Sequence, residues 1–151
     1  HQITVDGVTY KLKDPFMVLA TQNPMEYEGT FPLPEAQLDR FMMKVNIGYP
    51  DETSELNMLK RFKEINPLTE LKPVASTEDI IRIKNEVKSV MVNSGVEMYI
   101  LSIVRSTREN DKILLGASPR ASLNLYRASQ GRAILKGRDF VTPDDVKYVS
   151  K

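Results

Sequence analysis

The sequence predicts a chain of two parts, an α/β segment over residues 1–49 and an all-α region over residues 50–151. Residues 1–49 contain apolar or alternating runs of strand length, whereas the later apolar residues repeat at helical spacing. The break Gly48-Tyr49-Pro50 separates the two patterns. We therefore place the domain boundary near Tyr49.

The composition is that of a soluble globular protein, with 41% hydrophobic and 27% charged residues. The formal net charge of +1 gives no support to a nucleic-acid partner. No apolar run reaches the length of a membrane span, and no cysteine is present for a disulfide or a thiolate metal site. We expect a cytoplasmic protein that binds neither membranes nor nucleic acid.

Residues 2–12 predict a β-hairpin with Asp6-Gly7 as its two-residue turn. This dipeptide is favoured where both turn positions need a positive φ. The predicted register has three cross-strand pairs: Val5 with Val8, Ile3 with Tyr10, and Thr4 with Thr9. An ordinary surface hairpin explains these residues.

Residues 16–20 predict a strand that is buried on both faces. The run is short, continuous and apolar, which is typical of a parallel strand between two layers of helices. Ligands of such sheets bind at the carboxyl ends of the strands, where Asn23 lies. Pro24 disfavours a helical conformation at Asn23, so the strand must end there.

A short helix over residues 35–40 follows a loop rich in Pro, Gly and Glu. Pro34 suits the start of this helix, because the N–H that proline lacks has no partner there. A second strand is predicted over residues 41–47, and its alternate residues share one face: Met43, Val45 and Ile47.

The later residues predict a series of helices. Helical spacing runs through residues 51–65 and is interrupted at Asn66-Pro67. Gly137 is expected to end the helix that includes residues 119–136. Three helix starts carry capping signals: Ser76 with Asp79, Ser94 with Glu97, and Ser118 with Pro119. Thr142-Pro143-Asp144-Asp145 is expected to open the last helix.

Three motifs together resemble the MoxR family of AAA+ ATPases. The family's segment from sensor 1 to the arginine finger resembles ATQNPMEYEGTFPLPEAQLDRF, residues 20–41. Its sensor 2 motif resembles GASPRASLNLYRAS, and the helix start that follows resembles GRDFVTPDDV. The motifs occur in the family's order at compatible spacing. The resemblance implies a partial AAA+ αβα core over residues 1–49 and a helical lid domain over residues 50–151.

The resemblance also implies the site residues. Asn23 would be sensor 1, and Arg40 the arginine finger that reaches the γ-phosphate bound by a neighbouring subunit. Both are expected to be catalytic. Arg120 would be sensor 2, so Arg120 and Asn23 are the expected nucleotide-binding residues, and no metal ligand is expected in this chain.

Each of these residues also has a plain structural interpretation. Asn23 could close a turn with its own backbone, and Arg40 could pair with Asp39 or Glu35. Arg120 could be a surface arginine that pairs with a neighbouring domain. A positive charge at the start of a helix opposes the helix dipole, and a nearby anion such as a phosphate would offset that cost.

The implied activity is ATP hydrolysis at the subunit interfaces of a ring, expected to be a hexamer, with ATP and Mg²⁺ as cofactors. Hydrolysis would drive chaperone-like remodelling or maturation of client proteins, beside a partner with a von Willebrand factor A domain. Three alternatives stay open. They are a non-catalytic helical interaction module, the lid region of a related AAA+ magnesium chelatase or helicase, and a DNA-binding helical domain.

Two nucleotide-binding motifs do not occur in this sequence. There is no G-x-x-x-x-G-K-[ST] loop to hold phosphates and no apolar strand that ends in paired acids for Mg²⁺. His1 also leads directly into a strand pattern, so we expect a piece of a longer chain.

We predict that these 151 residues alone have negligible ATP turnover and very weak nucleotide affinity, because the phosphate loop and the magnesium ligands are absent from their sequence. Phosphate release and a nucleotide titration on the purified chain check this. Measurable ATPase activity would contradict it.

Overall fold

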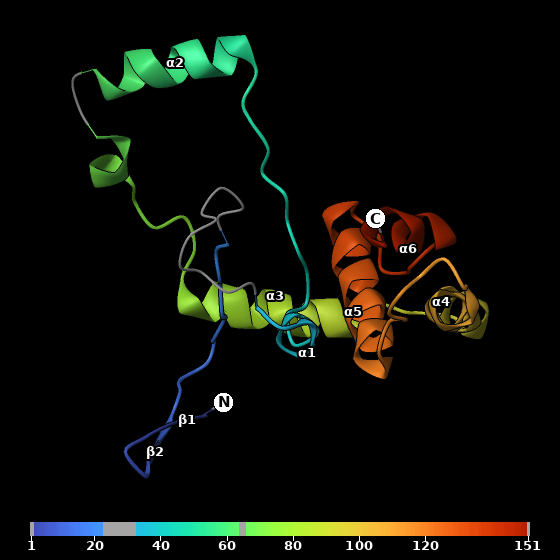
Figure 1. Cartoon of the computed structure of the whole chain (residues 1–151). Helices are drawn as coiled ribbons and strands as arrows, with labels where there is room; N and C mark the ends of the chain where they lie inside the picture. Colours follow the sequence, from blue (N-terminus) through green and yellow to red (C-terminus); the bar gives the residue numbers. More distant parts are fainter. Residues whose placement is uncertain (1, 23–32, 64–65, 151) are drawn as a thin grey trace.

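The structure is a computed structural model that describes residues 2–22, 33–63 and 66–150. Within them the elements follow in the order β1 (Gln2–Val5), β2 (Val8–Lys11), α1 (Glu35–Leu38), α2 (Glu52–Phe62), the 3₁₀ helix η1 (Pro67–Glu70), α3 (Thr77–Ser89), α4 (Ser94–Glu109), α5 (Pro119–Leu135) and α6 (Pro143–Val149). Figure 1 shows helices α3 to α6 gathered together, with the hairpin and α2 standing away from them. None of the described helices is both long and apolar enough to cross a bilayer.

The β1–β2 hairpin confirms the predicted register. Asp6 and Gly7 adopt positive φ values of 50° and 80°, as the turn requires. The cross-strand pairs are those expected: Val5 with Val8, Ile3 with Tyr10, and Thr4 with Thr9. The hydroxyl oxygens of Thr4 and Thr9 lie 3.0 Å apart in a hydrogen bond across the strands. The local turn chemistry is therefore sufficient to set this register.

The two strands predicted over residues 16–20 and 41–47 are wrong, because neither forms in this structure. Residues 16–20 and 41–47 belong to no strand, and apart from the half-buried Phe41 their large apolar side chains are exposed, from 43% for Phe16 to 95% for Ile47. A parallel strand needs hydrogen-bonded neighbours and a helical layer on each face. The only sheet among the described residues is the β1–β2 hairpin, so neither segment has a neighbouring strand there.

The exposed area of the chain reflects these uncovered segments. The chain exposes 13405 Å², whereas a compact monomer of 17.2 kDa is expected to expose about 7,800 Å². Apolar side chains of α2 contribute as well, among them Leu56, Leu59 and Phe62. Compactness is thus confined to the helical region that follows α2 and η1.

That helical region has one hydrophobic core. Its buried cluster consists of Val90, Val96, Ile100, Ala133, Val141 and Val146. Helix α5 packs against α3, α4 and α6, which places α5 at the centre of the arrangement. The buried Gln130 of α5 also donates from Nε2 to the backbone oxygen of Val90 at 2.8 Å. Burial in this core is what holds α5 in position.

Side-chain caps begin the helices near the predicted residues, with one shift. Ser76 caps α3 within a capping box, and Ser118 caps α5, both as predicted. Helix α4 is capped by Asn93 instead of Ser94, since the Asn93 side chain accepts from the backbone N of Val96 at 2.9 Å. Asn and Ser are comparable caps, so either residue could have begun this helix.

A buried carboxylate joins α5 to the start of α6. Asp145, only 2% exposed, accepts hydrogen bonds from Arg138 Nη1 at 2.8 Å and Nη2 at 2.6 Å. Arg132 of α5 approaches the same carboxylate at 3.4 Å, and its guanidinium lies 3.3 Å from the centroid of the Tyr148 ring. The hydrogen bonds from Arg138 are the main reason that the pKa of Asp145 falls from 3.8 to about 2.

The low pKa of Asp145 predicts that acid destabilises the chain. The folded state favours the ionised carboxyl, so its contribution is fully present above pH 3.8 and is lost as the pH falls toward about 2. Linkage makes this contribution about 2 kcal/mol. Asp145→Asn should lower the free energy of unfolding at neutral pH by roughly 3 kcal/mol, because it leaves the guanidinium groups of Arg132 and Arg138, which are only 22% and 26% exposed, without their carboxylate. Urea unfolding at several pH values, followed by circular dichroism, measures both effects.

Asp144→Asn is the matched control for this experiment. Asp144 is the adjacent residue, and its exposed side chain contacts only Lys147, at 3.7 Å, among the ion pairs of the described chain. Exposed pairs of this kind contribute at most about 1 kcal/mol. An Asp145→Asn protein as stable as the control, with the same acid dependence, would show that the pair does not stabilise the fold.

Candidate functional site

The turn after α1 meets the beginning of α5 through a small set of polar contacts. Ser118 Oγ donates to Asp39 Oδ1 at 2.6 Å, and Arg120 Nη1 donates to Asp39 Oδ2 at 3.3 Å. Asn124 Nδ2 donates to the backbone oxygen of Phe41 at 3.2 Å. These residues lie 79 to 83 positions apart in the sequence. We call this set of five residues the α1–α5 latch.

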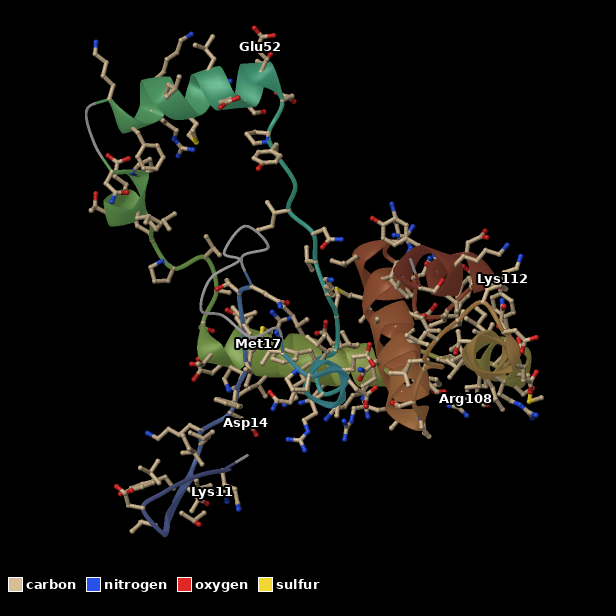
Figure 2. All side chains as sticks on the ribbon, in the orientation of Figure 1. Lys11, Asp14, Met17, Glu52, Arg108 and Lys112 are labelled. Atoms are coloured by element: carbon tan, nitrogen blue, oxygen red, sulfur yellow. The ribbon has the colours of Figure 1, made fainter. Side chains whose placement is uncertain are left out.

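Helix α4 positions the beginning of α5. Thr107 Oγ1 accepts from the backbone N of Ala117 at 2.9 Å, and Arg108 Nε donates to the backbone oxygen of Ala117 at 2.7 Å. Figure 2 labels Arg108 on α4 and Lys112 near the loop that leads to α5. Gly116 allows this close approach, since a Cβ there would lie 2.7 Å from Arg108 Cγ. Ser118 and Arg120 therefore extend from a loop that is fixed at its base.

Asp39 supplies a negative charge at the beginning of α5. Its carboxylate lies where the helix dipole favours an anion, and it offsets the unfavourable position of Arg120 in the first turn. Two partners for Arg120 fit the sequence: an anion such as a phosphate, and a group in the neighbouring domain. In the structure the anion is a carboxylate of the same chain.

The contact between Arg120 and Asp39 is weak. The Arg120 side chain is 50% exposed and that of Asp39 is 35% exposed, so water screens their attraction. Ion pairs of this kind contribute roughly 0.2–1 kcal/mol. A stronger anion can therefore compete with Asp39 for the guanidinium.

Arg40 follows directly after Asp39 and is exposed. Among the described residues, no hydrogen bond or ion pair joins the Arg40 side chain to another residue. The two local pairings considered from the sequence, with Asp39 and with Glu35, are thus not formed there. Among the described residues, then, nothing occupies the guanidinium of Arg40.

An open groove of about 790 Å³ lies beside the latch. Asn23 itself falls outside the described residues. Residues 21–22, which precede it, line the groove together with Ala117 and Ala121, which lie on either side of Arg120 in the sequence. Chain segments next to two of the predicted nucleotide-binding residues therefore border one groove.

The chemistry of the described side chains suits an anion. Arg40 and Arg120 are permanently charged, and guanidinium groups bind phosphate oxygens through charge-assisted hydrogen bonds. Within the described residues there is no group of three or more His, Asp or Glu that could hold a metal ion. These residues fit the charge of a triphosphate, and they offer no magnesium site.

Sequence reasoning missed the roles of three latch residues. Asp39 was considered only as a partner of Arg40, Ser118 only as a helix cap, and Asn124 was not considered. Helical patterns and capping signals relate residues within one or two turns. They contain no information about partners that lie about 80 residues away.

Two family models match the ends of the chain. A model described as "ATPase family associated with various cellular activities (AAA)" matches residues 1–43, and one described as "AAA lid domain" matches residues 105–151. These matches agree with the predicted order of a partial core followed by a helical lid.

Known proteins match nearly all of the chain. It is 48% identical over 148 residues to the uncharacterized protein YeaC of Bacillus subtilis, covering 98% of this chain and 46% of that protein. It is 37% identical over 155 residues to Chaperone MoxR1 of Mycobacterium tuberculosis, covering 97% and 41%. The crystal structure of a "putative ATPase" from Cytophaga hutchinsonii superposes with a TM-score of 0.89 at 42% identity, covering 99% and 48%.

The fold and these matches define the class: the chain belongs to the AAA+ proteins, with an AAA core segment followed by a helical lid. It spans less than half the length of the relatives that it matches. Within that class the chain belongs to the MoxR family, which confirms the resemblance stated from its motifs.

Gly116→Ala should lower the free energy of unfolding by roughly 1–3 kcal/mol, because the added methyl group overpacks the contact with Arg108. Gly131→Ala in α5 is the matched control. A Cβ at Gly131 meets nothing within 4 Å, so the better helix propensity of alanine should stabilise the chain by roughly 0.5–1 kcal/mol. Urea denaturation of both variants checks the difference, and equal stability would refute the close approach.

Proposed function

We propose that the whole protein hydrolyses ATP at the interfaces between subunits of a ring. The observation that carries this is the contrast between two adjacent residues. Asp39 is bound to the lid of its own chain, whereas Arg40 is exposed and makes no polar side-chain contact within the described ranges. An arginine in the turn after a short helix, with no polar side-chain partner among the described residues, is suited to act on another subunit.

In this proposal Arg40 is the arginine finger and Arg120 is sensor 2. Arg40 would stabilise the charge that develops on the γ-phosphate of ATP bound by the neighbouring subunit. Arg120 would contact the nucleotide of its own subunit from the lid. Asn23 remains the predicted sensor 1 residue, at the end of the segment that lines the groove with residues 21–22.

The division into domains follows the same proposal. Residues 1–49 would complete the nucleotide-binding core of the whole protein, and residues 50–151 would form the lid. The exposed apolar side chains of residues 16–20 and 41–47 support this, since both segments suit strands of a larger sheet. ATP and Mg²⁺ are the proposed cofactors, with the magnesium ligands elsewhere in the whole protein.

The proposed ring is a hexamer in the cytoplasm that remodels or matures client proteins. The similarity to a protein named Chaperone MoxR1 supports a chaperone-like role. A protein with a von Willebrand factor A domain is the proposed partner. Movement of the lid and of the subunits would transmit the energy of hydrolysis to the client.

Replacement of Arg40 in the whole protein tests the proposed function. Arg40→Ala should bind ATP as the unaltered protein does and still assemble, but its ATPase rate should fall by roughly 10³–10⁵, the effect of arginine fingers elsewhere. Phosphate release at saturating ATP measures the rate, and size-exclusion chromatography with light scattering measures assembly.

Arg61→Ala is the control, since Arg61 is an exposed arginine of α2, and α2 stands away from the latch. It should retain full activity. If Arg40→Ala hydrolyses ATP as fast as Arg61→Ala, Arg40 is not the finger.

A further inference from the structure

We propose that Asp39 is a positioning residue that couples the lid of one subunit to the arginine finger that the same subunit presents to its neighbour. This inference rests on the proposed function. It concerns how the state of one nucleotide site reaches the next site. Of the five latch residues, only Arg120 has a role in the predicted nucleotide site. Asp39 has none.

Arg40 lies between two residues that are bound to α5. On one side Asp39 uses both carboxylate oxygens, one for Ser118 and one for Arg120. On the other side the backbone oxygen of Phe41 accepts from Asn124. The backbone that carries Arg40 is therefore held to the lid on both sides, and a movement of α5 relative to the core must carry Arg40 with it or break these contacts.

Arg120 cannot serve Asp39 and a phosphate equally. Its contact with Asp39 is 3.3 Å long and half exposed, whereas a guanidinium binds phosphate oxygens through shorter and stronger charge-assisted hydrogen bonds. A nucleotide in the site of the same subunit thus takes Arg120 from Asp39. The carboxylate then keeps only the hydrogen bond from Ser118, and the turn that carries Arg40 loses one of its three attachments to α5.

Two consequences follow. First, Asp39 competes with the nucleotide for Arg120, so loss of its charge should tighten nucleotide binding. Second, the position of Arg40 depends on whether its own subunit holds a nucleotide. Hydrolysis in the neighbouring subunit then responds to that occupancy, which appears as cooperativity in the dependence of the ATPase rate on ATP concentration.

Asp39→Asn in the whole protein tests the role of the negative charge, because it removes the charge and keeps the size of the side chain. Asparagine retains an oxygen that can accept from Ser118, but it carries no charge to hold Arg120. We expect the affinity for ADP, measured by calorimetric titration, to rise roughly two- to fivefold, the range set by exposed ion pairs. The Hill coefficient of ATP hydrolysis should fall toward that of independent sites.

Glu35→Gln is the matched control. Glu35 is an exposed carboxylate of α1, four residues before Asp39, and its side chain is absent from the latch. This variant removes the same charge from the same short helix. It should leave both the ADP affinity and the Hill coefficient unchanged.

A double-mutant cycle with Arg120→Gln tests whether Asp39 affects ADP binding through Arg120. If Asp39 acts by competing for Arg120, Asp39→Asn should not change ADP affinity once Arg120 has been replaced. A purely structural role of Asp39 would instead change stability in both backgrounds and leave ADP affinity unaffected. The ADP measurements do not involve Arg40. Their outcome is therefore independent of whether Arg40 is the arginine finger.

Three results would overturn the inference: an unaltered protein without ATP cooperativity, an Asp39→Asn protein that keeps the original ADP affinity or cooperativity, and an equal gain in affinity with and without Arg120. The failure of the proposed function looks different. It is an Arg40→Ala protein that still hydrolyses ATP at the full rate.

Discussion

The position of α5 is the constraint on which the rest of the structure depends. Its C-terminal half carries all of its buried residues, Ser129, Gln130 and Ala133, and Gln130 is bonded to the backbone at the end of α3. Its first turns lie beyond this core and carry Ser118, Arg120 and Asn124. Because one continuous helix joins the two ends, packing in the core determines where the polar side chains of the latch are presented. A rigid element of this kind is the best support for a functional site.

Two aspartates contact α5, and each pairs with arginine. The two ion pairs differ in how far water can reach them. Asp145 is buried near two arginines at the C-terminal half, so removing its charge leaves both guanidinium groups without their anion where water reaches them only in part. Asp39 is only partly buried at the N-terminal end and pairs with one exposed arginine. Water can replace the lost partner there, which makes that contact exchangeable. The helix is therefore fixed at one end and able to change partners at the other.

Turn and cap residues in the sequence predicted most of the helical region. They could not predict burial that depends on segments far apart in the sequence. The Asp6-Gly7 turn and the Ser76 and Ser118 caps each depend on a few neighbouring residues, and all three occur as expected. Residues 16–20 have the composition of a buried strand, but burial needs partners that the described residues do not supply. The latch joins residues about 80 positions apart, so its existence could be known only from the structure. The roles of Arg40 and Arg120 came from family motifs, and they stay predictions.

The separation of Asp39 from Arg40 has a simple geometric cause. Asp39 retains helical backbone angles, with φ −57° and ψ −19°, and consecutive side chains on a helix point in different directions. Glu35 is one turn before Asp39 but five residues before Arg40, beyond the spacing at which helical neighbours meet. Neither Glu35 of α1 nor its C-cap Asp39 is therefore placed to neutralise Arg40. Opposite charges that are adjacent in the sequence can thus face two different surfaces, one toward the lid and one toward solvent.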